Sequence, residues 1–252
     1  MLSIPLLLIH KPLPNIDKNI LELKGKNWKK YSFEFLSIFI AVISAFALNN
    51  WNDNRKDKKA EQKILIEIKN GLEKDLEDLK INNKGHKRGI KACQFWRDVI
   101  QNKEVIIDSV QLRFVELTRD FTSLQNNSGY ETLKSKGLEI IENDSLRSKL
   151  ISLYEYDYYT LRKLEEEYEE MQYQKNYFKD INKILAPNFV FDKKGNLINI
   201  ETPIKLNKSD KNILMSYLMK IELNRRMVLT FYKKTEKKIN NLESLIEKNI
   251  KR

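Results

Sequence analysis

The chain has 252 residues, of which 41% are hydrophobic and 32% are charged, and this balance excludes both a protein with several membrane spans and a disordered chain. Its formal net charge of +11 does not indicate nucleic-acid binding, because Lys and Glu alternate along the same predicted helices and no Arg-rich or aromatic-interleaved patch is present. Gly and Pro are scarce, which favours long helices, and the single cysteine excludes an internal disulfide.

Residues 1–30 are predicted to form a basic lead-in. Residues 1–14 begin with a short apolar run, but no basic residue precedes the run and Pro5 interrupts it, so they do not match a standard signal peptide. We expect them to be either a peripheral lipid contact or an over-extended start of the chain.

Residues 31–51 are predicted to cross a membrane as one helix. Residues 35–48 contain no charge, Gly or Pro, and with their flanks they supply about 20 residues, or roughly 30 Å of helix, which matches a bilayer core. Trp28 and Tyr31 precede the apolar run and Trp51 follows it, as is typical of residues at the headgroups. A buried core helix is the alternative, and the aromatic and basic flanks favour the membrane.

Glu34 is the only charged residue within the predicted span. A carboxylate inside the bilayer would mark an ion path or a proton relay. Because Glu34 lies one turn from Lys30 and Tyr31, we expect it in the headgroup layer, as a fourth residue of the membrane interface.

Two stretches of the chain resemble a known family. The first is residues 33–56, FEFLSIFIAVISAFALNNWNDNRK, and the second is residues 128–150, SGYETLKSKGLEIIENDSLRSKL. Both resemble a family of uncharacterised bacterial single-pass membrane proteins, in which an apolar helix with an early Glu ends in an N-N-W-N-E-like box. Asp53 stands where that family usually has Glu, and Ala-Leu precedes the two asparagines. The resemblance implies an architecture and no activity.

The orientation of the span is weakly encoded, because four basic residues lie near each of its ends. We expect an inner-membrane protein with a cytoplasmic N-terminus and an extracytoplasmic C-terminal domain, since a long C-terminal domain can translocate regardless of its charge.

Residues 52–252 are predicted to form one helical bundle domain. The helix of the span is expected to continue through residue 80, a second helix to cover residues 89–101, and a third to follow a cap at Asp108. Gly71 weakens the first helix without ending it. The side chains expected to face the core are Leu65, Ile68, Leu72, Leu76, Leu79, Ala92, Phe95, Trp96, Val99, Val110, Phe114, Leu117, Phe121 and Leu124.

Capping signals predict the remaining elements. Ser128 and Glu131 form a capping box for a short helix over residues 130–136, which Gly137 closes. Asp144 is expected to cap a long helix that ends before Pro187, and Ser209 the last helix. Between them, residues 189–200 change to a two-residue period around a Lys-Gly-Asn turn, which predicts a small β-hairpin.

The two long helices are predicted to pair with each other. Residues 145–186 and 210–251 each contain 42 residues and could each extend about 63 Å. Equal lengths joined through a hairpin favour an antiparallel intramolecular pair over coiled coils between chains. Lys175 and Asn182 interrupt the apolar seam of the first helix, where polar residues can fix the register. The fold class is therefore all-α: a single transmembrane helix continuing into a bundle of long antiparallel helices with one small β-hairpin.

The sequence contains no pattern of a metal site or a catalytic centre. His86 and Cys93 lie seven residues apart without a third ligand of either type, and Cys93 beside two aromatic residues is interpreted as a core residue. The acidic run at residues 165–170 is interpreted as a solvated helix face, because calcium needs oxygens that converge from a tight loop. We expect no cofactor, no metal and no enzymatic activity.

Tyr130, Glu131 and Lys134 are the remaining candidate for a recognition surface. They lie on the short capped helix between longer helices, where their side chains could meet a partner. The alternative, which we favour, is a connector whose Tyr130 and Leu133 plug the end of a bundle, because the caps already explain most of its residues.

The expected function is that of a membrane-tethered, non-enzymatic interaction or scaffold protein. Its expected partners are the lipid bilayer and either another protein or a second copy of the chain, and no nucleic acid is expected. The alternative is an extracytoplasmic ligand-sensing helical bundle, which a bound small molecule would distinguish from a scaffold.

Overall fold

The computed structural model describes residues 17–106 and 110–251, with side chains from Trp28 onward. Contacts divide the chain into two compact units, Met1–Asp57 and Lys58–Arg252. The described part is helical apart from one two-stranded sheet, so the predicted all-α class with one small hairpin is confirmed.

The elements are short in the middle of the chain and long at its two ends. In chain order they are α1 (Asp17–Ile100), α2 (Val110–Thr118), α3 (Ser128–Lys136), η1 (Leu138–Ile140), α4 (Asp144–Ile151), η2 (Ser152–Asp157), α5 (Tyr158–Arg162), η3 (Lys163–Glu167), η4 (Glu169–Met171), α6 (Tyr173–Asn176), α7 (Phe178–Leu185), η5 (Ala186–Asn188), β1 (Phe189–Phe191), β2 (Leu197–Ile200) and α8 (Lys208–Ile250).

The described residues of the first unit all belong to α1. Side chains 28–52 are exposed, as an apolar segment surrounded by lipid requires. The hydroxyl of Ser37 donates to the backbone oxygen of Phe33 at 2.8 Å, so this polar group is satisfied within the helix.

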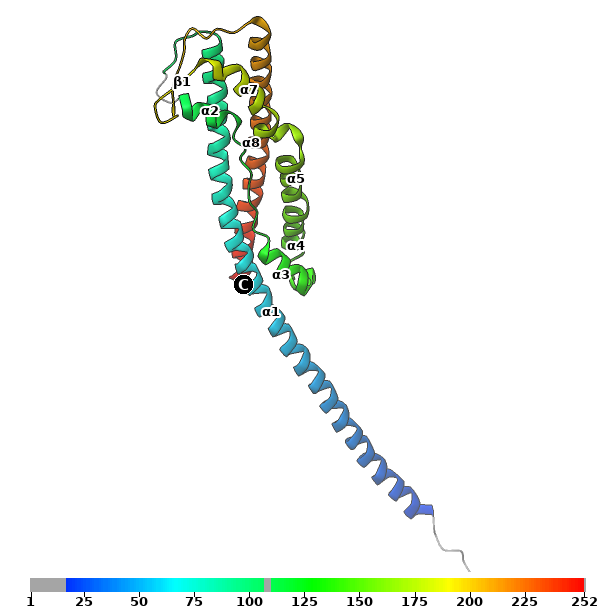
Figure 1. Cartoon of the computed structure of the whole chain (residues 1–252). Helices are drawn as coiled ribbons and strands as arrows, with labels where there is room; N and C mark the ends of the chain where they lie inside the picture. The colour runs from blue at the N-terminus through cyan, green and yellow to red at the C-terminus, as the bar shows by residue number, and fades with distance from the viewer. Residues whose placement is uncertain (1–16, 107–109, 252) are drawn as a thin grey trace, which may run out of the picture. The chain divides into compact units, whose positions relative to one another are not determined.

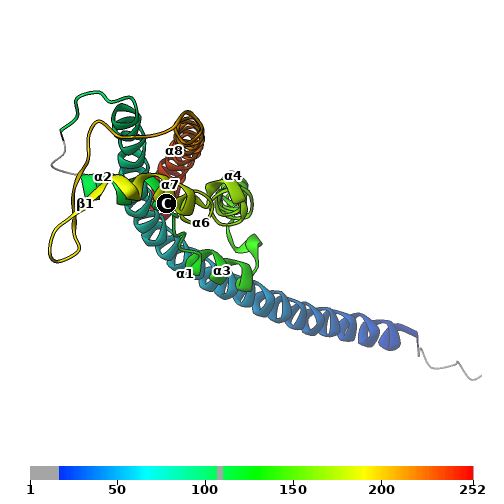
Figure 2. The same cartoon turned by 45° about the horizontal axis from the view of Figure 1, so that its top comes forward.

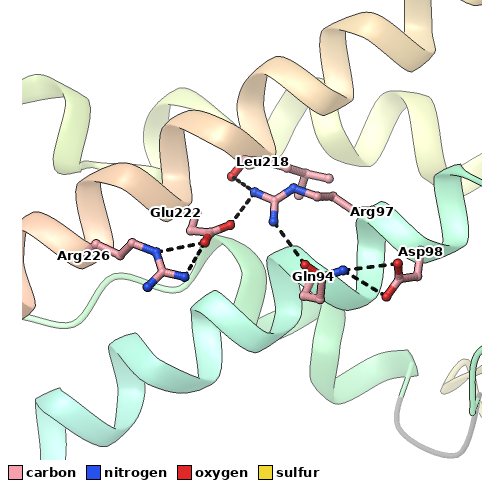
Figure 3. A network of polar contacts seen from close by, with 6 residues as sticks. All are labelled: Gln94, Arg97, Asp98, Leu218, Glu222 and Arg226. Carbon is pink, nitrogen blue, oxygen red and sulfur yellow. Dashed lines mark hydrogen bonds and ion pairs between the residues drawn. The ribbon is translucent and has the colours of Figure 1, made fainter.

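In the second unit, α8 lies alongside α1 and runs in the opposite direction, as Figures 1 and 2 show. Lys69 pairs with Glu247 at 3.0 Å at one end of this contact. At the other end Arg97 pairs with Glu222 and donates to the backbone oxygen of Leu218 at 3.4 Å (Figure 3). These ion pairs show the antiparallel register of the two longest described helices.

The predicted apolar stripes form the core of the second unit. Those of α1 and α2 are buried or half-buried as predicted through Leu117, but Leu124 is 74% exposed because α2 ends at Thr118. The buried stripe of α8 comprises Leu214, Leu218, Ile221, Val228, Thr235, Ile239, Leu242 and Ile246.

The prediction of a separate helix over residues 89–101 is wrong, because α1 continues without a break to Ile100. Residues 80–89 contain two asparagines, two glycines and His86, which are weak helix formers. Tertiary contacts override this weakness: His86 is buried, and Asn82 donates to the backbone oxygen of Thr122 at 3.1 Å. The expected cap at Asp108 lies outside the described residues.

The prediction of one long helix over residues 145–186 is also wrong. Two π-helical segments, η2 and η3, interrupt it, and the backbone becomes extended at Tyr168. The freed backbone groups find partners in other segments: Asp120 accepts from the amide of Tyr173 at 2.7 Å, and Asn224 donates to the oxygen of Glu170 at 3.0 Å. This segment packs against α8 through α4, η2, η4 and α7. The predicted pairing of two continuous helices is therefore replaced by contacts between α8 and four short elements.

Three predicted N-caps are displaced. Asn143 rather than Asp144 caps α4, and Asn207 rather than Ser209 caps α8, accepting from the Asp210 amide at 2.8 Å. The Ser128 capping box does not form, because its hydroxyl donates to Asn126. Gly137 does end α3, with a φ of 97°.

The predicted hairpin over residues 189–200 is confirmed. Its strands β1 and β2 pair antiparallel with Phe189 opposite Ile200, and a bulge follows Val190. Asp192 accepts from the amides of Lys194 and Asn196, both at 2.8 Å, and thereby shapes the turn. The hairpin packs through β2 against α2.

Candidate functional site

The connection between α2 and α3, residues 119–127, forms an extended strap along α1. Asn82 binds the oxygen of Thr122, Asp78 accepts from the amide of Leu124 at 2.8 Å, and Asp75 accepts from the amide of Asn126 at 2.7 Å. An extended chain advances about 3.3 Å per residue and a helix about 1.5 Å. Two strap residues therefore span about one turn of α1, and each turn offers one side chain to the strap.

Glycines allow the strap and its neighbours to approach α1 closely. A Cβ atom on Gly85 would lie 2.4 Å from the Phe121 ring, and one on Gly89 would lie 2.4 Å from the Arg225 guanidinium. The i, i+4 spacing places both glycines on one face of α1. Any larger residue there would push the ring or the guanidinium away.

Glu165 holds the strap from the opposite side. Its carboxylate is buried and accepts from the amide and hydroxyl of Ser123, at 3.1 Å and 2.7 Å, and from the hydroxyl of Tyr232. Burial raises the pKa of Glu165 to about 7, although the bonds from Tyr232 and Ser123 act in the opposite direction. The interpretation of residues 165–170 as a solvated face is therefore wrong for Glu165, while Glu166 and Glu167 are exposed.

Arg225 is fully buried and closes the C-terminal end of α2. Its guanidinium donates to the backbone oxygens of Glu116, Leu117 and Arg119, at 3.3, 3.1 and 2.9 Å, and lies 4.4 Å from the Tyr173 ring centre. It forms no ion pair with the described carboxylates. Burial lowers the pKa of Arg225, but an arginine stays protonated, so the helix-end carbonyls stabilise its charge.

A cavity of about 210 Å³ lies between the strap, α1, α8 and the segment from η3 to α6. Glu165 thus contacts both the cavity and the strap. The lining residues are His86, Asp120, Phe121, Thr122, Glu165, Glu166, Met171, Gln172, Tyr173 and Val228. Larger hollows of about 370 to 510 Å³ occur elsewhere on the described surface, but none of these three is lined by a buried polar side chain that lacks a partner.

His86 is among the residues that line this cavity, and it carries a buried hydrogen-bond donor without a partner in the described chain. The side chain is 2% exposed, and burial together with the nearby Arg225 charge lowers its pKa to about 3, so the ring is neutral at physiological pH. Arg225 donates to Nδ1 at 3.3 Å, which assigns the ring proton to Nε2. The Phe121 carbonyl partly opposes the shift, yet Nε2 makes no hydrogen bond within the described chain.

Cys93 is a core residue, as predicted. It is fully buried, and burial raises the pKa of its thiol to about 12, which keeps it protonated. The described residues contain no cluster of three or more His, Cys, Asp or Glu side chains that could hold a metal.

The structure keeps the three residues of the predicted recognition surface together, with Lys134 Nζ 5.7 Å from the Tyr130 ring centre, but it buries Tyr130. Tyr130 is buried and stacks on Tyr154 with ring centres 4.4 Å apart, as the connector interpretation requires. Lys134 pairs with Glu131 at 3.4 Å and with Glu155 at 3.3 Å on the outside of α3. A recognition role for Glu131 and Lys134 stays a prediction.

The four predicted membrane-interface residues, Trp28, Tyr31, Glu34 and Trp51, are all exposed on α1. Lys30 lies 4.0 Å from Glu34, one turn away, as expected for a pair in the headgroup layer. Within the described residues, one helix is long and apolar enough to cross a membrane, and none of its apolar stretch is buried.

The cavity was not predicted from the sequence, although the sequence contains one indication that Glu165 is buried. Tyr154, Tyr158, Leu161 and Glu165 follow one helical face and are all buried, so the phase of Glu165 places it inward. Asp120 and His86 gave no such signal, because tertiary contacts alone bring them together.

Comparison with known proteins identifies the family and nothing beyond it. No curated protein and no solved structure matches the chain. The model of a family of unknown function, DUF6090, matches residues 34–200, which include the apolar run 35–48, the strap and most of the cavity lining. The chain therefore belongs to the DUF6090 family.

Proposed function

We propose that this protein is a membrane-anchored, non-enzymatic sensor module whose helical domain binds a small molecule in the cavity beside His86. The sequence left two binding functions open, a scaffold and a ligand sensor. The observation that favours the sensor is His86, which is among the residues lining the cavity and whose buried Nε2 donor lacks a partner in the described chain. An unsatisfied buried donor costs about 1–3 kcal/mol, which a bound acceptor would offset.

The strap supplies a route from the cavity to the rest of the domain. Asp120, Phe121 and Thr122 line the cavity, and the following strap residues bind Asp78 and Asp75 on α1. A ligand that displaced or fixed the first part of the strap would change the contacts along α1. Because α1 also contains the apolar span, we propose that the strap links ligand binding to the anchor.

Mass spectrometry of small molecules released from the purified full-length protein tests this function. Thr122→Trp is the matched control, because the Thr122 side chain lines the cavity but is exposed, so a larger side chain can cover the cavity without entering the core. We expect a compound that is enriched in the wild-type protein and lost in the variant. If the same compounds are released in equal amounts from the wild-type protein and the variant, the cavity holds no ligand and the proposal is overturned.

An exposed apolar stripe on α8 favours the scaffold as a second candidate. Met219, Leu223 and Met227 follow one another at four-residue spacing and are 52%, 57% and 37% exposed. A pull-down of the wild-type protein from its native membrane, compared with Leu223→Lys, tests this function. Loss of a co-purified membrane protein in the variant would support a scaffold.

We propose that the helical domain lies on the extracytoplasmic side of the inner membrane. A sensor of an external ligand requires this location. Lys194 in the exposed hairpin turn offers a labelling site. Lys194→Cys should react with an impermeant thiol reagent in cells whose outer layer is permeabilised, whereas the buried Cys93 should not. Protection of the introduced cysteine would reverse the orientation.

A further inference from the structure

We propose that the cavity beside His86 takes a small ammonium compound that also carries an oxygen acceptor, such as an amino alcohol or an amino acid. This inference rests on the proposed function and names the class of its ligand. It follows from the hydrogen-bonding groups and charges that the lining residues leave uncommitted.

Acidic groups dominate the charged lining of the cavity. Asp120, Glu165 and Glu166 come from the strap and from η3, and no lysine or arginine is among the lining residues. Asp120 accepts from the amides of Tyr173 and Gln174 through Oδ1 alone, at 2.7 Å and 3.4 Å, so Oδ2 is free of bonds to the described chain. A cationic donor would meet a carboxylate oxygen there, and such charge-assisted bonds are stronger than neutral ones.

The nearest buried cation lies outside the lining of the cavity. Arg225 directs Nη2 to three backbone oxygens and Nη1 to His86, and although its Nε has no partner within the described chain, Arg225 is not among the lining residues. An anion in the cavity would face the carboxylates without a lysine or arginine in the lining to pair with. The charge distribution therefore favours an ammonium group over a carboxylate or phosphate as the main charge of the ligand.

The donor on His86 requires an acceptor on the same ligand. Because Nδ1 accepts from Arg225, Nε2 carries the proton and cannot accept from an ammonium group. A hydroxyl, carbonyl or carboxylate oxygen on the ligand would satisfy it. The buried, unpartnered Nε2 of His86 points to a ligand independently of the acidic lining.

The size of the cavity suits a small ligand. Its volume is about 210 Å³. A two- or three-carbon amine with one or two oxygens fits this space.

Calorimetric titration of the detergent-purified full-length protein with three two-carbon probes tests the proposal. Ethanolamine carries an ammonium group and a hydroxyl, ethylene glycol replaces the ammonium with a hydroxyl, and glycolate replaces it with a carboxylate. We expect saturable binding of ethanolamine, at least tenfold weaker binding of ethylene glycol, and no binding of glycolate.

Two substitutions show whether the binding uses this cavity. Asp120→Asn keeps the oxygen that accepts from Tyr173 and removes the charge, so the fold should persist while ethanolamine binds at least tenfold more weakly. Glu167→Gln is the control, because Glu167 is an exposed carboxylate outside the lining, and it should leave the affinity unchanged.

The outcomes separate this inference from the proposed function. Tighter binding of glycolate or ethylene glycol than of ethanolamine would overturn the ligand class and leave a ligand-binding cavity in place. An unchanged ethanolamine affinity in Asp120→Asn would place the binding elsewhere and overturn the inference. If ethanolamine does not bind while the wild-type protein releases an enriched compound without an amine, the class is wrong and the sensor function stands.

Discussion

Glu165 and Ser123 are 42 positions apart in the sequence, yet the Glu165 carboxylate accepts both the amide and the hydroxyl of Ser123, at 3.1 Å and 2.7 Å. One carboxylate therefore fixes the backbone and the side chain of the strap at the same point. Since Glu165 also lines the cavity, the charge of this group affects both the strap and a bound ligand.

The stability of the domain should depend on the ionisation of Glu165. Its pKa is raised from 4.5 to about 7 in the folded protein, so between these values the folded state holds a proton that the unfolded state has released. Stability is then greatest at low pH and falls as pH rises through about 7, by on the order of 2–3 kcal/mol. Asp75, with a pKa raised to about 6 mainly by burial, contributes in the same direction.

Urea unfolding of the wild-type protein and of Glu165→Gln between pH 5 and pH 8 measures this effect. Gln keeps an oxygen for Ser123 but does not titrate, so the decline of stability with pH should become shallower. Glu166→Gln, which changes the neighbouring exposed carboxylate, should keep the wild-type decline. Identical pH profiles for wild type and Glu165→Gln would contradict a raised pKa of the buried Glu165.

Arg225 should be far more sensitive to substitution than the adjacent Arg226. Arg225→Lys replaces a planar fork that reaches three backbone oxygens by a single ammonium group, and we expect a loss of about 2–4 kcal/mol of unfolding free energy. The Arg226 side chain is 60% exposed and pairs only with Glu222, so Arg226→Lys should change stability by less than about 0.5 kcal/mol. Equal losses in urea unfolding would show that Arg225 is not the cap of α2.

Gly129 is required for the close approach of α3 to α1. A Cβ atom there would lie 2.8 Å from the backbone nitrogen of Ile68, and a helix backbone cannot yield as a side chain can. We expect Gly129→Ala to lose about 1–3 kcal/mol of unfolding free energy. Ser128→Ala removes the hydroxyl that donates to Asn126 but keeps the amide that donates to the same oxygen, so it should cost less. If Ser128→Ala loses more unfolding free energy than Gly129→Ala, Ser128 caps α3 after all.

The long elements of this fold could be predicted, because their signals are local. The stripes of α1 and α8 repeat every three or four residues, and the Lys-Gly-Asn turn marks the hairpin. The caps were misplaced by one or two positions because adjacent Asn, Asp and Ser residues can each cap a helix, as Asn143 beside Asp144 shows.

The strap and the cavity could not be predicted, because their contacts join distant segments. Nothing local indicates that Asp75 binds the amide of Asn126 or that Asn224 supports the backbone of Glu170. The same contacts allow the interruption of the helix near Tyr168, whose sequence alone favours a continuous helix. Helix propensity failed where tertiary hydrogen bonds replaced helical ones.

Charges placed in the apolar segment should release the protein from the membrane. Ile40→Arg combined with Ile43→Arg should add about 5–7 kcal/mol to insertion and move the protein from the pellet to the supernatant after carbonate washing. Ile81→Arg is the control, since Ile81 is 65% exposed on the same helix but outside the apolar segment. Release of the wild-type protein itself would contradict the anchor.

Nitrogen-15 NMR of the imidazole rings tests the central claim, a ligand site at His86, most directly. The chain has only two histidines, so a His86→Gln variant assigns the signals. We predict that the His86 ring stays neutral to below pH 5, in keeping with a pKa of about 3, and that ethanolamine shifts its Nε2 signal saturably. An Nε2 signal that does not move while ethanolamine binds would contradict a ligand site at His86.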